Sequence, residues 1–199
     1  RRALDSARSN NLPGDTVTRA IKRGTVELEG VNYEEICYEG YGPGGVAILV
    51  DTLTDSKNRT VGEIRQIFTR HNGNMGESGC VGWMFNKRGI LTVPKPKATE
   101  DRLMELGLDA GIEEIIDQGD NWEVQTAPDK IDIVKKALSA ADVEVTEAKF
   151  EKLPQTTVRL EGRPAESMLK LYEALEEHDD VQAVWANFDI SDDVMERLE

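Results

Sequence analysis

The stretch Tyr38-Glu39-Gly40-Tyr41-Gly42-Pro43-Gly44-Gly45-Val46 decides between two fold classes. Its glycines match G-x-G-x-x-G, a pattern that binds dinucleotide phosphates when it follows a strand and opens a helix. Here the chain continues with the apolar run Val46-Ala47-Ile48-Leu49-Val50, which is typical of a strand. Two β-rich runs, 33–39 and 46–53, therefore flank a loop in which glycine supplies positive φ angles. We expect a β-hairpin here and no nucleotide site.

The residues that follow this hairpin predict one helix and a second hairpin. The helix is expected from about Thr60 to His71, because four apolar residues recur at helical spacing: Val61, Ile64, Ile67 and Phe68. After a glycine-rich turn, the runs 81–85 and 90–93 favour two strands joined by Lys87-Arg88-Gly89. Pro94-Lys95-Pro96-Lys97 then indicates a stiff connector to another unit.

The rest of the chain alternates helices and strands over short lengths. Thr99 is the expected N-cap of a helix that reaches about Ala110, and Pro128 begins another helix. The remaining expected elements are strands at 112–117, 122–126, 143–147, 156–160 and 181–188 and a helix at 164–177. Residues 1–24 favour two short helices, more typical of a small helical bundle than of a DNA-binding helix-turn-helix. The mixture predicts an α+β fold with ferredoxin-like sandwiches rather than a doubly wound parallel sheet.

Charge is distributed unevenly over the 199 residues, whose formal net charge is −14. The segment 57–97 holds eight basic and two acidic residues, whereas 98–199 holds ten basic and 27 acidic residues. An acidic protein repels polyanions at long range, but a local basic surface binds nucleic acid where its geometry is fixed. The longest apolar run, Val46–Val50, is too short to span a membrane. We therefore expect the function to reside in the segment 57–97.

Six cations of this segment are the candidate nucleic-acid-binding residues: Lys57, Arg59, Arg65, Arg70, Lys87 and Arg88. If Arg59 lies at a helix N-terminus, its guanidinium and the backbone N–H groups would point at the same anion. Glycines at positions 73, 76, 79 and 82 would let a nucleic-acid backbone approach closely. The competing interpretation is that Arg65 and Arg70 line a solvated helix face and that the glycines serve turns.

The sequence offers few residues for catalysis or metal binding. Cys37 and Cys80 form no Cys-x-x-Cys pair, so we expect no disulfide scaffold and a reducing, cytoplasmic setting. His71 and His178 are the only histidines and no cluster has metal-ligand spacing, so no metal or cofactor is expected. An enzyme that uses Cys80 or Ser78 as nucleophile, with His71 as base, stays open as a distant alternative.

Several long motifs, spread over nearly the whole chain, resemble the YebC family. They are Ala20-Ile21-Lys22-Arg23-Gly24, the stretch from Tyr38 to Gly45, Asp55-Ser56-Lys57-Asn58-Arg59-Thr60, the stretch from His71 to Phe85, and Asn187-Phe188-Asp189-Ile190-Ser191. The resemblance implies a helical first domain, of which 1–28 are part. It also implies a second α+β domain at 29–95 plus 155–199 and a third inserted at 96–154. Members of the family begin with a lysine-rich segment that does not occur in this sequence.

The same resemblance implies a function. Family members are usually assigned as DNA-binding transcriptional regulators, which implies a non-enzymatic, cytoplasmic regulator of gene expression with a nucleic-acid partner. Relatives, including a mitochondrial translational activator of a cytochrome oxidase subunit, act on ribosomes, and bacterial members resemble factors that relieve stalling at proline runs. A ribosome-associated translation factor that recognises RNA is therefore the alternative, and the net charge of −14 favours it physically. The resemblance brings no catalytic residue, metal or cofactor to this chain.

Overall fold

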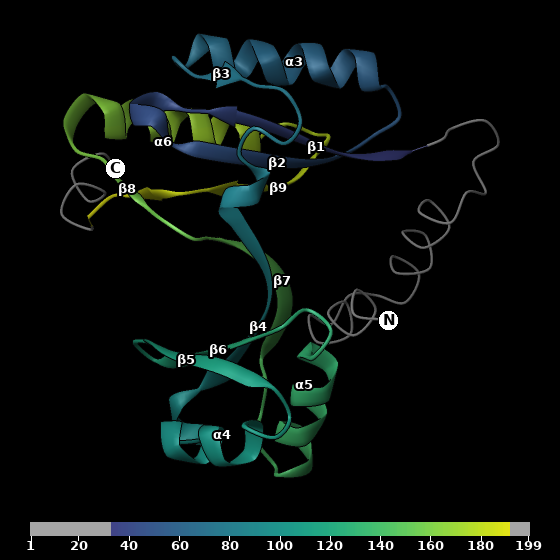
Figure 1. The fold of residues 1–199 in the computed structure, drawn as a ribbon, viewed down its shortest axis with the longest axis vertical. Coiled ribbons are helices and arrows are strands. Elements are labelled where there is room, and N and C mark those ends of the chain that lie inside the picture. Colours follow the sequence, from purple (N-terminus) through teal and green to yellow (C-terminus); the bar gives the residue numbers. More distant parts are fainter. Residues whose placement is uncertain (1–32, 192–199) are drawn as a thin grey trace.

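The computed structural model describes residues 33–191, which form two lobes joined by a pair of long strands (Figure 1). The strands are β1 (Glu34–Tyr41), β2 (Ala47–Thr54), β3 (Asn74–Met75), β4 (Phe85–Pro94), β5 (Ile112–Gln118), β6 (Asn121–Thr126), β7 (Glu147–Pro154), β8 (Val158–Arg159), β9 (Val181–Ala186) and β10 (Phe188–Asp189). The helices in this range are α3 (Lys57–Arg70), α4 (Glu100–Gly107), α5 (Ile131–Ala140) and α6 (Gly162–Glu176), with the 3-10 turns η1 (Pro43–Gly45), η2 (Gly82–Met84) and η3 (Lys95–Lys97). The helices predicted within 1–24 lie outside the described residues.

Each lobe contains a four-stranded sheet with two helices packed against it. The first lobe holds the first sheet, of order β3-β1-β2-β9, with α3 and α6. The second lobe holds the second sheet, of order β5-β6-β4-β7, with α4 and α5 (Figure 1). Neighbouring strands in both sheets are antiparallel, while β8 and β10 form a separate parallel pair. Helices on antiparallel sheets confirm the predicted α+β class.

β1 and β2 form the predicted hairpin, because they pair antiparallel along their whole length. A hydrogen bond from the Gly42 N–H to the Val46 carbonyl, 2.8 Å long, closes the connecting loop. Gly44 and Gly45 have φ angles of +75° and +80°, which glycine adopts without steric strain. The loop leads into a strand, so the helix N-terminus that a dinucleotide fingerprint requires is not formed here.

The core of the first lobe combines the predicted apolar stripe of α3 with one face of α6. Ile64 and Phe68 are fully buried, and Val61 and Ile67 pack at the edge of the same cluster. The buried residues of α6 are Ala165, Met168, Leu171 and Leu175. Because α3 buries only this stripe, its opposite face is left to solvent. None of the helices in residues 33–191 is long and apolar enough to cross a membrane.

The prediction of a second hairpin around Lys87-Arg88-Gly89 is wrong. Residues 81–84 form a turn and η2, and the following ten residues form the single strand β4. β4 pairs with β7 over residues 85–92 and with β6 over residues 89–94, so the tripeptide lies inside a sheet. A Lys-Arg-Gly sequence favours a turn locally, but partner strands that come later in the chain satisfy its backbone groups.

The second lobe packs α4 and α5 against one face of its sheet. Leu91 of β4 lies in a core with Leu103 of α4 and Val134 of α5, and all three are fully buried. Thr99 caps α4 as predicted, because its hydroxyl oxygen accepts the Arg102 N–H at 3.3 Å. The capped helix is thus positioned by its sequence signal and held by the core.

Strands occur where the sequence predicted them in this half of the chain, with one exception. β5, β6, β8 and β9 overlap the predicted ranges. The strand predicted at 143–147 is wrong, because β7 begins only at Glu147. Val143 follows a turn at Asp142, which has a φ of +59°, and is buried against the second lobe's core. Its apolar character therefore serves a loop contact, while the polar residues of β7 become a strand by pairing with β4.

Gly89 marks the close approach of β4 to α5. A Cβ at this position would lie 2.6 Å from Thr126 Oγ1 and 2.9 Å from Ile131 Cβ. We expect Gly89→Ala to lower the free energy of unfolding by about 1 to 3 kcal/mol, because packed groups must move. Gly62→Ala, at an open position of α3, is the control and should raise it by up to about 1 kcal/mol. Urea unfolding measures both, and a Gly89→Ala protein as stable as the parent would contradict this packing.

Candidate nucleic-acid interface

α3 presents a basic face that is open to solvent. Its buried stripe faces the first sheet, Arg65 and Arg70 flank the outward side, and Lys57 is exposed in the first turn. Figure 1 shows α3 as the outermost layer of the first lobe. Within residues 33–191, these three cations have no ion pair and no side-chain hydrogen bond. Their charges are therefore available to an external anion.

The spacing of these cations suits an extended polyanion. At about 1.5 Å per residue, the thirteen steps from Lys57 to Arg70 span about 20 Å along the helix axis. The exposed residues between them include the short or uncharged Asn58, Gly62, Gln66 and Thr69, together with the ion-paired Arg59 and Glu63. Glu63 is the one acidic residue between Lys57 and Arg70, and its carboxylate contacts Arg59 and His178 rather than Arg65 or Arg70.

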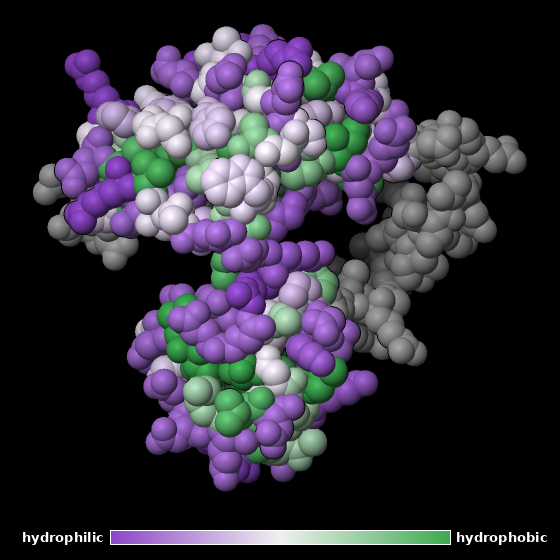
Figure 2. Space-filling view, in the orientation of Figure 1, coloured by the Kyte–Doolittle hydropathy of each residue, from purple (hydrophilic) through white to green (hydrophobic). Residues whose placement is uncertain are grey.

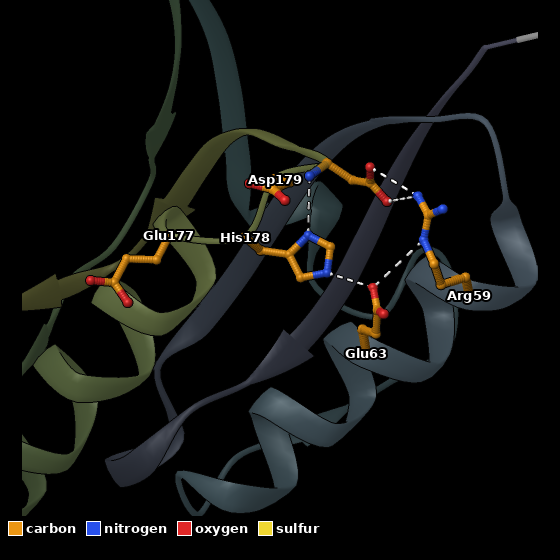
Figure 3. A pocket seen from close by; sticks show the side chains of 6 residues that line it. Arg59, Glu63, Glu177, His178 and Asp179 are labelled. Carbon is orange, nitrogen blue, oxygen red and sulfur yellow. Dashed lines mark hydrogen bonds and ion pairs between the residues drawn. The ribbon is translucent and has the colours of Figure 1, made fainter.

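Arg59 lies in the first turn of α3, but it already binds anions of its own chain. Its Nη2 is 2.8 Å from Asp180 Oδ2 and 3.0 Å from Asp55 Oδ1, and its Nε is 3.8 Å from Glu63 Oε2. Figure 3 shows Arg59 and Glu63 of α3 facing the turn between α6 and β9. Burial alone would raise the pKa of Asp180, but hydrogen bonds from Thr60 and Arg59 outweigh it and hold the pKa below its usual value. Arg59 therefore ties α3 to that turn.

His178 extends this network along a shallow pocket (Figure 3). Its Nδ1 accepts the Asp180 N–H at 3.1 Å, so the proton of the neutral ring sits on Nε2, 3.0 Å from Glu63 Oε2. Glu63, His178 and Asp180 are metal-ligating residue types whose donor atoms lie within 4.8 Å of one another. Arg59 and Thr60 already supply donors to these carboxylates. The arrangement thus fits an internal ion network better than a metal site.

The two cations of β4 are also engaged, and they lie in the strand rather than at a hairpin tip. Arg88 forms an ion pair with Glu113 of β5. Lys87 Nζ lies 4.8 Å from the centre of the Phe150 ring, a cation–π contact. The structure therefore leaves Lys57, Arg65 and Arg70 exposed at different angles around α3 and places the β4 cations apart from them.

A buried glutamate, which the sequence analysis missed, shapes the glycine-rich segment 73–82. Glu39 is 9% exposed, and its carboxylate accepts the N–H groups of Gly79, Val81 and Gly82 at 2.6 to 2.8 Å. Burial alone would raise the pKa of Glu39, but these three donors outweigh it and hold the pKa below its usual value. Gly79 has a φ of +88°. At least two of the predicted backbone-approach glycines thus serve a turn around a carboxylate. The only signal in the sequence that could have indicated this buried carboxylate is the position of Glu39, directly before the hairpin glycines.

The candidate nucleophiles lack the environment that catalysis needs. Burial, followed by the charge of Glu39, raises the pKa of Cys80. The thiol stays protonated at neutral pH, whereas a catalytic thiol requires the opposite shift. Within the described residues no hydrogen bond joins His71 to Cys80 or Ser78. The geometry therefore gives no support to the enzyme alternative.

A second missed group joins the two lobes. Lys152 Nζ on β7 lies 2.6 and 2.7 Å from the two carboxylate oxygens of Asp51 on β2. Trp185 of β9 donates its Nε1–H to the same carboxylate at 3.1 Å. Burial, followed by a hydrogen bond with Asp51, raises the pKa of the nearby Cys37 to about 12. Asp51 and Lys152 are 101 positions apart, so no local pattern could have found this contact.

Comparisons with known proteins agree with one another. A family model described as TACO1/YebC second and third domain matches residues 33–188. Proteins named probable transcriptional regulatory protein from Desulforapulum autotrophicum, Geobacter sulfurreducens and Magnetococcus marinus are 50%, 52% and 51% identical to this chain. Each match covers 100% of this chain and 80% of the relative. The crystal structure of a conserved hypothetical protein from Aquifex aeolicus is 40% identical, with a TM-score of 0.84 over 96% of this chain and 79% of that chain.

Replacing Glu39 should destabilise the protein in a pH-dependent way. Glu39→Gln removes the charge and puts an NH₂ group against N–H donors, so we expect a loss of about 2 kcal/mol in the free energy of unfolding at neutral pH. Because the folded-state pKa is lowered from 4.5, the stabilisation by Glu39 is present above that value and is lost as the pH falls below it. The difference between variant and parent should therefore shrink between pH 5 and the more acidic range.

Urea unfolding at a series of pH values measures this difference. Glu77→Gln is the matched control, because Glu77 lies in the same segment with an exposed side chain, and we expect a change of less than about 0.5 kcal/mol. A constant difference at every pH would contradict the role of the Glu39 charge.

Proposed function

The chain belongs to the TACO1/YebC family, and we propose from this premise that it is a non-enzymatic regulator of gene expression that binds nucleic acid. The names of its relatives support a regulatory role. The observation that carries the proposal is the exposed side of α3, where Lys57, Arg65 and Arg70 have no ion-pair partner among residues 33–191, in a protein of net charge −14. We assign it to the cytoplasm, where its two free cysteines would stay reduced.

Electrostatics would make this contact an oriented one. The acidic residues concentrated in 98–199 repel a polyanion from most approaches, whereas the basic face of α3 attracts it. Arg59 and Arg88 would first have to leave their carboxylate partners, so we give them a smaller part than the three unpaired cations. Lys87, in contact with an aromatic ring, adds charge at a second place.

Duplex DNA is the partner that the relatives' names suggest, and structured RNA on the ribosome is the second candidate. The small number of unpaired cations on α3 favours the second. Three phosphate contacts would give a log–log salt slope of only about −2.7 on duplex DNA. Structured RNA can be recognised through its shape and its 2′-hydroxyls as well, which adds affinity without added charge. A factor that relieves stalling at proline-rich stretches is one form of this second candidate.

Charge reversal on α3 tests the proposal. We expect Arg65→Glu combined with Arg70→Glu to weaken binding about tenfold or more, a loss of about 1.4 kcal/mol, because two phosphate contacts become repulsive. The salt slope on duplex DNA should also become shallower by about 1.8. Fluorescence anisotropy over a salt series, with duplex DNA and a structured ribosomal RNA fragment in parallel, measures both effects. Co-sedimentation of the parent and the variant with ribosomes measures whether the same residues are needed for binding to the intact ribosome.

The matched control reverses two neighbouring lysines on another helix. Lys135→Glu combined with Lys136→Glu on α5 changes the net charge by the same amount and should leave the affinity within about twofold of the parent. Circular dichroism checks that each variant is folded. If both double variants lose affinity equally, the effect comes from net charge alone and not from α3. If charge reversal on α3 leaves binding unchanged, α3 is not the binding surface.

A further inference from the structure

We propose that Trp83, with Tyr41 beside it, forms a stacking platform for the unpaired bases of a single-stranded nucleic acid. This inference rests on the proposed function and adds a contact to bases, which the cations of α3 do not provide. Trp83 lies in η2, and Tyr41 is the last residue of β1. The two come from segments that the glycine-rich loop brings together.

Exposure is the first observation. Trp83 is 69% exposed and Tyr41 is 40% exposed. The other two tryptophans are half-buried, and their N–H groups are used inside the protein: Trp122 donates to the Ala98 carbonyl at 2.9 Å, and Trp185 donates to a carboxylate. A single exposed indole would need no explanation, but Trp83 and Tyr41 together form an exposed aromatic patch, which is typical of a binding surface.

A shared acceptor holds the two rings. Trp83 Nε1 and Tyr41 Oη both donate to the carbonyl oxygen of Cys80, at 3.2 and 3.3 Å. Each polar group is thereby satisfied within the chain, so what the pair offers to a ligand is mainly its aromatic faces. Recognition by such faces is tolerant of sequence, because every nucleobase has a π-face.

The backbone beneath Trp83 is fixed before any ligand arrives. Its neighbours two positions away on either side, Val81 and Phe85, are buried in the core below the first sheet. The Gln155 side chain donates to the Trp83 carbonyl at 2.9 Å. Glu39 binds the N–H groups of the preceding turn. Because this segment is already ordered, a ligand that stacks on Trp83 pays little conformational entropy.

The surroundings favour a base over a phosphate or an apolar partner. Between residues 72 and 85 the only formally charged side chain is Glu77, and Ser78 and Gly79 are exposed. Figure 2 shows a pale surface, neither strongly hydrophilic nor strongly hydrophobic, over the part of the first lobe where this segment runs from β3 to β4. The exposed aliphatic residues of the described chain, Met104, Leu108 and Ile133, lie on the second lobe instead.

The chain connects the basic face to the platform around the β3 edge of the first sheet, because α3 packs on one side of that sheet and Val81 and Phe85 on the other. α3 ends at Arg70, and four residues later Asn74 pairs with Tyr41 across the β3–β1 ladder. A strand whose phosphates contact Arg70 would pass this edge of the sheet to lay a base on the rings. Paired bases inside a duplex are already stacked and would not be available, which makes the contact selective for single strands.

The test compares short labelled oligouridylate, oligothymidylate and duplex DNA by fluorescence anisotropy. Trp83→Ala should weaken binding to the single strands by about 5- to 150-fold, which is the 1–3 kcal/mol of one stacked base. Trp83→Phe should restore most of the affinity, and the salt slope should not change because no phosphate contact is lost. If Trp83→Ala lowers the affinity for RNA and DNA single strands equally, the ring contacts only the base. If it lowers the affinity for RNA alone, the natural ligand of the platform is RNA. Quenching of a 2-aminopurine base by the parent but not by Trp83→Ala would report stacking directly.

Tyr33→Ala is the matched control, because Tyr33 is another exposed aromatic residue, 54% exposed, and should leave binding unchanged. Unaltered single-strand affinity in Trp83→Ala, or an equal loss on duplex DNA, would overturn the platform. If reversal of the α3 charges weakens binding while Trp83→Ala does not, only the platform fails. If the parent protein binds none of the probes and no ribosomes, the proposed function fails with it.

Discussion

The carboxylate of Glu39 is the interaction on which the arrangement of the first lobe depends. A buried charge is costly unless hydrogen-bond donors replace the lost water, and three backbone N–H groups do so here. These bonds hold the turn at 79–82 against β1 and place Val81 in the core. They also determine where β4 begins, and hence how the second sheet connects to the first. They also support the turn directly before Trp83, whose ring bonds the Cys80 carbonyl.

The cations fall into two groups, those that form ion pairs within the protein and those that do not. Arg59, Arg88 and Lys152 bind carboxylates that come from other elements, so they position α3, β5 and β7. Lys57 and Arg65, by contrast, have no such partner among residues 33–191. The basic character of the segment 57–97 is therefore partly architectural, and what remains for a polyanion is the exposed side of α3, with Lys87 at a second place. A small unpaired charge in a strongly acidic protein favours oriented contact over general attraction.

Local signals predicted the elements that local interactions define. Glycines at 44 and 45 indicated the hairpin, the stripe of Ile64 and Phe68 indicated α3, and Thr99 indicated the start of α4. The prediction failed at β4 and at 143–147, where strand pairing with distant residues outweighed a turn-like tripeptide and an apolar residue. The cations were identified from the sequence, but their partners were not, because Asp180 lies 121 positions from Arg59.

The sequence by itself determined the α+β class, the family and the helix that bears the unpaired cations, because these follow from short-range periodicity, turn chemistry and long motifs. Only the tertiary structure decided which cations are free, why the glycines surround a carboxylate, and that Trp83 and Tyr41 share one carbonyl acceptor. These features depend on distances between residues far apart in the chain. Burial and ion pairing are properties of such distances, and no local pattern encodes them.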